Sequence, residues 1–587
     1  MSEKKTIQYG ISNFAKVSEL NAYYVDKTIY IPDIDAGNYL FLLRPRRFGK
    51  SLFISMLSMY YDIKLENEFD TLFKGTWIHA NPTKHKNKYF VLRFDFSKIN
   101  KEEGDIKDAF KDYCNGIVAD FMDYYKDYLP EDKAEKVLQS SYITDKIQNI
   151  ARCMRAIKKN LIIFIDEYDN FTNTLLSNRG AELYQEITRA NSFFNNFFRI
   201  LKGITGDDYP ALSKILITGI TPVTMDDLTS AFNIGLNISL YSSNNSMLGF
   251  TEKDVSDMYD YFIDESYSIN KDEAMNLMKT WYDNYRFTYE IKDTVYNTDG
   301  VLYFIESIVK DKKIPSNLID VNLRMNYMKI KNLVIQENEL NGNFDTLTEI
   351  ITTGRIYSLL VMSFPFDMIK RPFNYNSMLY FLGLLTFAEC SDSIFHLFVV
   401  PNETIKRLVF EYVHTCISGN FQINLKIEEF KNHLKEMSFS GISKPAFEFI
   451  ENDMNKLTSI RDFRNREQDI KAFFLIYFGF YDFYQVISEI EMNKGYADII
   501  LSPNTILYKQ IKYAYLIEFK YLPRKIKKKD LAPHLEQKIQ EAKTQLNKYI
   551  EDDKAKKLFS LPPNGIVQLK KIIIVFHGWK MVFCEEH

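Results

Sequence analysis

The sequence lacks the residues that build a disulfide framework, a zinc site or a membrane span. Only 5 of its 587 residues are cysteine and no two form a CxxC pair, and the 8 histidines include no HxxxH or HExxH pattern. The most apolar runs, Leu161–Ile165 and Lys571–Phe576, are far shorter than the ~20 residues of a membrane helix. The first residues are charged and resemble no secretory signal. We therefore expect a soluble cytoplasmic protein without a membrane partner.

An excess of charge of either sign is also missing. Lys and Arg number 74 against 77 Asp and Glu, which gives a net charge of -3 and excludes a globally basic nucleic-acid-binding protein. Any nucleic-acid site must be a local patch. There are no internal repeats and no Gly/Ser-rich or Pro-rich linkers, and 46% of the residues are hydrophobic. A chain of this length holds roughly three or four packed domains.

Changes of hydrophobic period divide the chain into three parts, 1–250, 251–467 and 468–587. In the first part, short apolar runs alternate with helical stretches, which predicts βαβ units and a parallel sheet; the runs are 39–43, 89–96, 161–166 and 214–220. The second part has mainly helical periodicity. In the third part strand patterns return at 486–492, 496–503, 513–520 and 571–583, with a helix predicted over 532–549. We predict an α/β module, a helical middle and a small α+β module.

A candidate phosphate loop follows the first predicted strand. The strand Tyr39–Leu43 runs into a loop that ends in Gly49, Lys50 and Ser51, and a helical pattern follows. In such a loop the backbone amides face the phosphates, the Lys reaches the β/γ oxygens, the hydroxyl holds magnesium and the Gly allows close approach. The generic pattern begins with Gly, whereas this loop begins with Arg44. A plain surface turn is the alternative.

The loop also carries three arginines. Arg44, Arg46 and Arg47 fit two interpretations, further phosphate ligands or a solvated basic turn. The sequence does not separate the two, and we carry Arg44 and Arg47 as candidate nucleotide-binding residues.

A second strand supplies acids for the same site. The apolar strand Leu161–Asp166 ends in Asp166 and Glu167. In nucleotide hydrolases an acid in the place of Asp166 binds magnesium, and its neighbour polarises the attacking water. Thr218, near the end of the next predicted strand, lies where a hydroxyl could sense the γ-phosphate. The alternative is a buried strand that ends in a polar turn, but its combination with the Gly-Lys-Ser loop favours nucleotide binding.

These segments resemble the AAA-ATPase-like family that is often fused to a C-terminal nuclease-like domain. The resemblance rests on Tyr23–Thr28, Phe41–Leu57, Phe164–Asp169, Ile215–Asn233, Gly249–Val255, Trp281–Phe287 and Leu397–Leu408. In that family the Arg-Pro-Arg-Arg loop is the usual form. The resemblance implies an AAA-like P-loop NTPase fold that uses ATP and Mg2+, with nucleotide roles for Lys50, Ser51, Asp166 and Glu167.

Three polar residues near the C-terminus form a candidate metal site. Two strands joined by a short turn would bring Asp498 beside Glu518 and Lys520, and the last two, being alternate strand residues, point to one face. Two carboxylates can hold magnesium, and a Lys can orient the attacking water. A hairpin with outward charges is the alternative. The D…ExK pattern resembles the PD-(D/E)XK nuclease superfamily.

That resemblance implies three accessory positions. Glu489 lies where many members of the superfamily carry a further acid, and the helix after the ExK strand would bring Gln545 and Tyr549 near the site. The same helix could equally be a plain amphipathic cover. The basic run Arg524–Lys529 is either a solvated turn or an attraction for a nucleic-acid backbone.

We therefore expect an ATP-binding and ATP-hydrolysing P-loop protein coupled to a Mg2+-dependent DNA endonuclease domain. The rival is a nucleotide-switched nucleic-acid-binding or regulatory protein that does not cleave, and a scaffold with decayed sites is the third option. No base-reading motif distinguishes DNA from RNA, and no oligomer interface can be read from the sequence.

Overall fold

The protein was analysed as a computed structural model, and its chain packs into two compact units. Unit 1 comprises Met1–Val334 with Ser358–Phe398, and unit 2 comprises Ile335–Tyr357 with Val399–His587. The predicted boundaries at residues 250 and 467 stay a prediction. The structure describes residues 4–99, 106–170, 192–206, 211–223, 232–324, 343–388, 394–420, 426–455, 467–492, 495–553 and 567–587.

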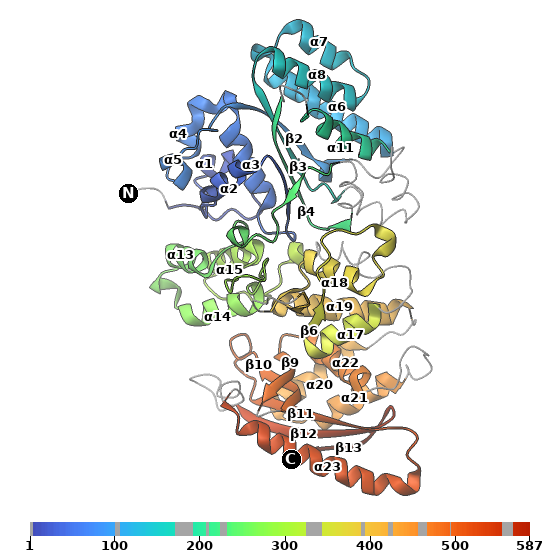
Figure 1. Ribbon diagram of the computed structural model, residues 1–587. Coiled ribbons are helices and arrows are strands. Elements are labelled where there is room, and N and C mark those ends of the chain that lie inside the picture. The colour runs from blue at the N-terminus through green and yellow to red at the C-terminus, as the bar shows by residue number, and fades with distance from the viewer. Residues whose placement is uncertain are drawn as a thin grey trace. The chain divides into compact units, whose positions relative to one another are not determined.

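Unit 1 contains a 5-stranded sheet with the order β2-β3-β4-β1-β5. Figure 1 labels its strands β2, β3 and β4. Every neighbouring pair is parallel, as the alternation of strand and helix patterns predicted. The β3 strand is buried from its second residue to its last, which explains its unbroken apolar sequence. The strands are β1 (Tyr39–Leu43), β2 (Tyr89–Asp95), β3 (Asn160–Asp166), β4 (Leu212–Gly219) and β5 (Leu236–Asn237).

Some helices of unit 1 pack on this sheet, and others pack on those helices. The β2 and β3 strands contact α3, α6 and α8, while α7 and α11 pack on α8. The helices of unit 1 up to this point are α1 (Ala15–Glu19), α2 (Ile31–Ala36), α3 (Lys50–Tyr61), α4 (Phe69–Leu72), α5 (Trp77–Ala80), α6 (Ile106–Tyr124), α7 (Glu131–Gln139), α8 (Ile143–Ala156) and α11 (Phe193–Gly203).

The middle of the chain is mainly helical, as predicted. A capping box begins its first helix, since the Thr251 hydroxyl accepts from the Asp254 amide and the Asp254 carboxylate accepts from the Thr251 amide. The helices are α13 (Glu252–Phe262), α14 (Lys271–Tyr282), α15 (Thr298–Asp311), α17 (Asn343–Thr353), α18 (Pro372–Phe381), α19 (Glu403–Asn420), α20 (Ile427–Ser440) and α21 (Lys444–Met454). Three short strands accompany them, β6 (Arg355–Ser358), β7 (Thr386–Phe387) and β8 (His396–Val399). In the described ranges, no helix combines the length and apolar character needed to cross a membrane.

Unit 2 ends in a second 5-stranded sheet with the order β13-β12-β11-β10-β9. Its β11 and β12 strands are parallel and its other pairs are antiparallel. The last predicted strand, 571–583, is instead a hairpin of two strands, because the chain reverses at Gly578. The elements are α22 (Glu467–Gly479), β9 (Tyr484–Met492), β10 (Gly495–Pro503), β11 (Tyr513–Leu522), α23 (Lys528–Ile550), β12 (Gln568–His577) and β13 (Lys580–Glu586).

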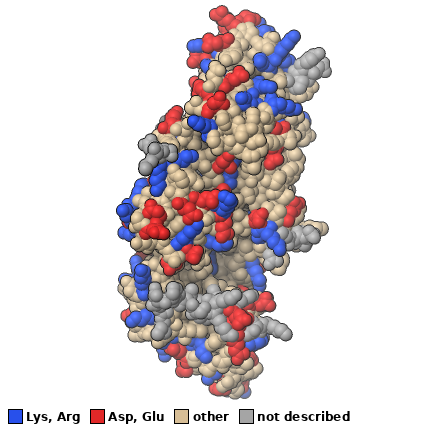
Figure 2. Space-filling view, turned by 90° about the vertical axis from the view of Figure 1, so that its left-hand side faces the viewer, with Lys and Arg blue, Asp and Glu red and all other residues tan. Residues whose placement is uncertain are grey.

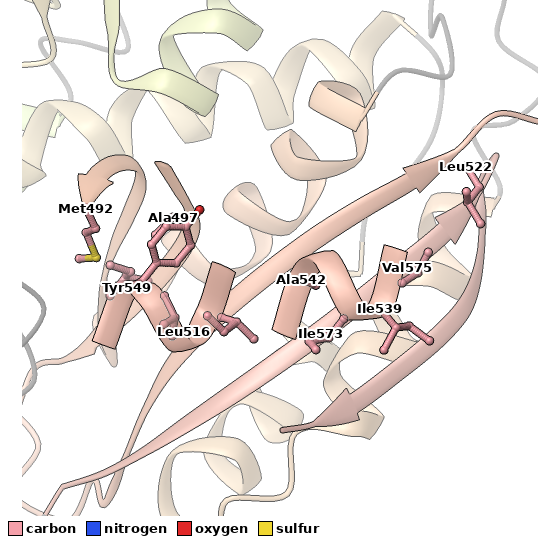
Figure 3. Close-up of a cluster of buried hydrophobic side chains, with 11 residues drawn as sticks. Met492, Ala497, Leu516, Leu522, Ile539, Ala542, Tyr549, Ile573 and Val575 are labelled. Carbon is pink, nitrogen blue, oxygen red and sulfur yellow. The ribbon is translucent and has the colours of Figure 1, made fainter. Parts of the chain in front are cut away.

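The long helix α23 covers one side of this sheet. Its residues Ile539, Ala542, Leu546 and Tyr549 recur at helical spacing and join a buried cluster with residues of β9 to β12. Figure 3 shows Tyr549 with Met492 and Ala497 at one end of the cluster, and Ile539 with Leu522 and Val575 at the other. The two faces of β11 pack against different helices. Leu516 lies in the cluster with α23, while the ring of Phe519 packs on Phe474 of α22 with the ring centroids 4.9 Å apart. The sheet thus has a helix on each side. The predicted α+β module is confirmed.

Candidate functional site

The phosphate-loop candidate has a strand-to-helix geometry. The β1 strand ends at Leu43 and α3 begins at Lys50, with Gly49 as its N-cap residue. Gly49 has a φ of 89°, in the left-handed region that only glycine adopts without strain. The first amides of α3 have no partner within the helix, so its N-terminus can bind an anion.

Arg44, the first loop residue, is a structural residue here. Its side chain is buried, and its guanidinium donates to the carbonyl oxygens of Leu43, Ser239 and Asn244 at 2.9, 2.7 and 2.9 Å. The guanidinium carbon also lies 4.3 Å from the ring centroid of Phe287. Burial lowers the pKa of Arg44 to about 10. This placement differs from both interpretations of the sequence, because Arg44 is neither solvated nor turned to a ligand.

Arg47 ties the loop to the start of α15. Its Nη1 donates to Asp299 Oδ2 at 2.8 Å, and its carbonyl oxygen accepts from the Thr298 hydroxyl at 2.8 Å. Burial raises the pKa of Asp299, and the Arg47 charge opposes that rise. The Arg47 side chain is partly exposed, and its guanidinium is paired with the Asp299 carboxylate. Arg46 contributes a positive charge near Lys50 and Glu167.

Lys50 lies under the loop. Its ammonium donates to the carbonyl oxygens of Arg44 at 2.9 Å and Pro45 at 2.8 Å, and these bonds use two of its three donors. Burial lowers the pKa of Lys50, and the acids Glu167, Asp166 and Asp169 act in the opposite direction. Ser51 is half-buried in the first turn of α3. The structure thus brings Lys50 into the field of the acids at the end of β3.

The sheet order places a hydroxyl between the loop and the acids. Since β4 lies between β1 and β3, Thr218 of β4 reaches the β3 acid and donates to Asp166 Oδ1 at 2.7 Å. The other oxygen, Asp166 Oδ2, is buried and accepts no hydrogen bond within the described part of the chain. Arg93 of β2, which the sequence reading missed, lies 3.7 Å from Asp166 Oδ2 and donates to the Ser51 carbonyl at 3.4 Å. The signal for Arg93 in the sequence was a cationic residue in an otherwise apolar strand.

Glu167 follows the strand in a strained conformation. Its φ is 49°, unusual for a non-glycine residue, and the Asn170 amide donates to its Oε2 at 2.5 Å. Burial raises the pKa of Glu167, while the charges of Lys50 and Arg46 oppose the rise. A carboxylate whose pKa is raised is a stronger base toward water than an exposed one.

Asp169, also missed from the sequence, fixes the end of β4. It is fully buried, and its carboxylate accepts from the amides of Ile220 and Thr221 and from the Thr221 hydroxyl. Asp169 therefore positions the backbone beside Thr218. The last acid of the Asp-Glu-Tyr-Asp run is structural.

A largely apolar pocket adjoins the phosphate loop within unit 1. Its lining comes from four segments of the chain and includes Gly49 and Leu52 at the start of α3. Its apolar lining also includes Ile11, Tyr24, Val25, Leu248, Phe250 and Leu302, and Lys27 and Asp299 are among its polar lining residues. The pocket opens beside the N-cap of α3.

In unit 2, three acids fall in one row across neighbouring strands. The β9–β10 pairs Ile490–Ala497 and Ser488–Ile499 place Glu489 opposite Asp498, and the pairing is interrupted at that position, where Glu489 has a φ of 50°. The β10–β11 register, continued by one residue from Ile499–Ile517, places Asp498 opposite Glu518. Cross-strand neighbours share a face of a sheet. The predicted juxtaposition of Asp498 and Glu518 thus follows from the strand register.

Glu518 and Lys520 form a buried pair. The Lys520 ammonium donates to Glu518 Oε1 at 2.6 Å, as expected of alternate residues on one strand. Glu518 Oε2 is buried and accepts no hydrogen bond from the described residues. Burial, followed by the charge of Asp498, raises the pKa of Glu518 to about 8, with Lys520 acting against the rise.

Lys471 of α22 completes the cluster, and the sequence analysis did not single it out. Its ammonium contacts Asp498 Oδ1 directly and lies 3.1 Å from Glu489 Oε1 and 3.0 Å from Glu467 Oε1. Asp498 Oδ2 accepts from the Phe519 amide at 2.7 Å. Burial raises the pKa of Asp498, and Lys471 opposes that rise. The signal in the sequence was a lysine within an apolar helix.

The two accessory residues on α23 differ in their contacts. Tyr549 is fully buried and its hydroxyl donates to the Tyr496 carbonyl at 2.9 Å. A Cβ on Gly495 would lie 2.9 Å from the Tyr549 ring, so the strand and helix approach closely only because residue 495 is glycine. Gln545 Oε1 is buried and accepts no hydrogen bond from the described residues. The acids Glu518, Asp498 and Glu489 raise the pKa of Tyr549 in addition to its burial, which places this end of α23 at the row.

The basic run after β11 is solvent-exposed. Arg524, Lys525, Lys527 and Lys529 are exposed, and the side chain of Lys528 lies outside the described residues. Figure 2 shows Lys and Arg interspersed with Asp and Glu over the face it presents. The structure therefore supports the description of this run as a solvated turn that continues into α23.

Neither the acids at the end of β3 nor the acids of the row in unit 2 supply a complete set of metal ligands. Among the described residues no cluster of three or more His, Cys, Asp or Glu side chains is arranged to hold a metal ion. The row in unit 2 contains two lysines among its acids, so Asp498 and Glu518 offer a pair of carboxylates rather than a full coordination shell. A bound ion there would take its remaining ligands from water or substrate.

Two family comparisons agree with this geometry. Residues 8–229 match the AAA-ATPase-like family, described as a predicted AAA-ATPase, and residues 465–586 match a family of the PD-(D/E)XK nuclease superfamily. The chain thus contains an AAA-ATPase-like domain and a PD-(D/E)XK nuclease superfamily domain, joined by a mainly helical middle. Both resemblances seen in the sequence are confirmed.

Individual relatives add little to this. An uncharacterised protein in the vnfD 5′ region of Azotobacter chroococcum mcd 1 is 28% identical over 309 residues, which cover 52% of each chain. The chain therefore spans about half the length of this relative. The solved structure of the Aeropyrum pernix Orc1 protein in complex with DNA covers 68% of this chain and 89% of its own at 9% identity, with a TM-score of 0.24. A likeness this weak carries no argument.

Proposed function

We propose that the protein binds and hydrolyses ATP in its N-terminal domain and uses this to control a Mg2+-dependent DNA endonuclease in its C-terminal domain. The observation that carries the proposal is the presence in one chain of two polar centres, the loop of Lys50 beside Asp166 and the row of Asp498 and Glu518 with Lys520. Each centre lies in a domain of the corresponding family.

The residues present fit a nucleotide with magnesium. The N-terminus of α3 would receive the phosphates, and Lys50 would exchange its loop carbonyls for phosphate oxygens. Ser51 and Asp166 Oδ2, which accepts no hydrogen bond from the described residues, would hold the ion. The apolar pocket beside Gly49 would take the base, because such pockets bind flat heterocycles through apolar contact.

Hydrolysis would depend on Glu167 and Thr218. Glu167, whose pKa is raised by burial, would accept a proton from the attacking water while Asn170 holds its carboxylate. Thr218, already bonded to Asp166, would sense the γ-phosphate through the same hydroxyl. We keep Arg47 as a nucleotide ligand that must first leave Asp299. Arg44 has no role in ligand binding in this proposal.

The residues of unit 2 fit a divalent ion as well. Glu518 Oε2 is a buried carboxylate oxygen without a hydrogen-bond donor, and Asp498 lies opposite it across the strands. A bound magnesium would polarise a phosphodiester and make its water more acidic. Lys520 would hold a water proton or a phosphate oxygen, Gln545 would accept from a bound water, and Glu489 would support the row from its edge.

Nucleic acid would be held by charge rather than by base contacts. The exposed lysines and arginine that follow β11 can neutralise backbone phosphates near the row, with an affinity that falls as salt rises. Duplex DNA is our proposed substrate, and cleavage of a labelled RNA tested under the same conditions is the alternative outcome.

The test is paired nicking and retention. Supercoiled plasmid is incubated with the full chain and Mg2+, with and without ATP, and labelled duplex is run on a gel at fixed salt. We expect Asp498→Ala and Glu518→Ala to abolish nicking, and Lys520→Ala to slow it by about 10²-fold or more while retaining metal binding. All three should keep much of the affinity for duplex.

Glu491→Ala is the matched control, because Glu491 is an exposed acid two residues from Glu489 on the same strand. It should nick at the wild-type rate. Wild-type protein that retains duplex but nicks neither DNA nor RNA with Mg2+ or Mn2+, with ATP present, would refute the endonuclease and support the nucleotide-switched binding protein.

A further inference from the structure

Lys471 is a buried cation whose position the proposed reaction does not explain. It lies on α22, a helix that is buried at every position from Asp469 to Gly479. Its side chain is only 9% exposed, yet three acids surround its ammonium, Glu467, Glu489 and Asp498. Burying an ion pair costs hydration, and an apolar residue of similar size often packs as well. The ammonium is therefore better explained by the acids than by the packing of the helix.

The contacts of Lys471 orient one carboxylate in the row. Asp498 Oδ1 accepts from Lys471 and Oδ2 accepts from the Phe519 amide, so both oxygens of this carboxylate are fixed. Lys520 in turn holds one oxygen of Glu518 and leaves Oε2 without a donor. Of the four carboxylate oxygens of Asp498 and Glu518, Glu518 Oε2 is the one that accepts no hydrogen bond from the described residues, whereas the side of Asp498 toward Glu489 is already occupied by a cation.

The net charge of the cluster also matches a single divalent ion. The group has four carboxylates, on Glu467, Glu489, Asp498 and Glu518, and two ammonium groups, on Lys471 and Lys520. When all are ionised, four negative against two positive charges leave a formal charge of −2, which one divalent ion neutralises. Loss of the Lys471 charge would change the formal charge from −2 to −3 and would free the space beside Asp498 and Glu489, so that a second divalent ion would be attracted there.

We propose that Lys471 is a built-in counter-ion of the carboxylate row, which positions Asp498 and Glu489 and occupies the place of a second metal, so that the row binds one divalent ion. The inference rests on the proposed metal site and deepens it. Lys471 is a positioning residue, because it acts through the acids rather than on the substrate.

The test counts bound Mn2+ on the full chain without nucleotide, by isothermal titration and by electron paramagnetic resonance. Wild type should bind one ion that Glu518→Ala removes. Lys471→Gln retains a donor for Asp498 but loses the charge, and it should bind two ions and show an exchange-coupled spectrum. Lys471→Arg, which keeps the charge, should bind one. A Lys471→Gln protein with one ion and unchanged affinity would overturn the proposal.

Folding is followed in the same samples by circular dichroism. A Lys471→Gln chain that folds only when Mn2+ is added would support the proposal, because the ion then replaces the ammonium. A chain that stays unfolded at saturating Mn2+ would overturn it. Failure of the proposed function has a different signature, since wild type would then bind one Mn2+ without nicking DNA, or bind none at all.

Discussion

The buried carboxyl group of Glu518 makes the stability of unit 2 depend on pH in a direction that one substitution tests. Glu518 is 1% exposed, and burial with the neighbouring Asp498 raises its pKa from 4.5 to about 8. The folded, metal-free chain therefore holds this proton more tightly than the unfolded chain. The associated stability is fully present below about pH 4.5 and is lost as the pH rises to about 8. At about 1.4 kcal/mol per pKa unit, the ceiling on this loss is about 5 kcal/mol.

Glu518→Gln keeps the shape of the side chain and an acceptor for Lys520 but removes the titration. We expect the free energies of unfolding of variant and wild type to be similar near pH 4.5. As the pH rises, the free energy of unfolding of the variant should increase relative to that of wild type. Near pH 9 in EDTA the variant should be more stable by several kcal/mol, within the ceiling of about 5 kcal/mol. The gain should level off above the folded-state pKa.

The assay is urea unfolding in EDTA, followed by pulsed hydrogen exchange and mass spectrometry on peptides from β10 and β11. These peptides report on unit 2 separately from unit 1, so that one transition is measured at a time. Glu491→Gln, which makes the same substitution at an exposed acid on β9, is the control. A difference between Glu518→Gln and wild type that stays constant from about pH 5 to about pH 9 would refute the assignment of a raised pKa to Glu518.

Three further predictions concern the N-terminal domain. Lys50→Ala should weaken ATP binding in calorimetry by about 2 kcal/mol, roughly thirty-fold, because a charged donor to the phosphates is lost; unchanged affinity would contradict the assignment. Glu167→Gln should lower the rate of phosphate release by about 10²-fold or more with ATP affinity preserved, and undiminished turnover would exclude Glu167 as the base. Asp299→Asn should free Arg47 for the phosphates and tighten ATP binding about five-fold, or about 1 kcal/mol, whereas weaker binding would show that the ion pair supports the loop.

Much of the fold could be predicted from the sequence because its signals are local. The apolar runs at 39–43 and 161–166 have strand length, and helical patterns separate them, so a parallel sheet follows without knowledge of distant contacts. The left-handed turn at Gly49 and the alternation of Glu518 and Lys520 along one strand are likewise properties of a few neighbouring residues. Chain order and residue type were sufficient to place both candidate sites.

Only the tertiary structure decided which polar side chains stay open to a ligand. Arg44 looked like the other loop arginines in the sequence, but the carbonyl oxygens of Ser239 and Asn244, almost 200 positions away, surround it and make it structural. Lys471 looked like one lysine in an apolar helix until the register of β9 and β10 placed Glu489 and Asp498 around its ammonium. Burial and pairing depend on what long-range packing brings within a few ångströms, and a strand or helix pattern carries no information about that packing. The sequence by itself therefore determined the elements and the residue types of both sites, and the packing determined their charge balance.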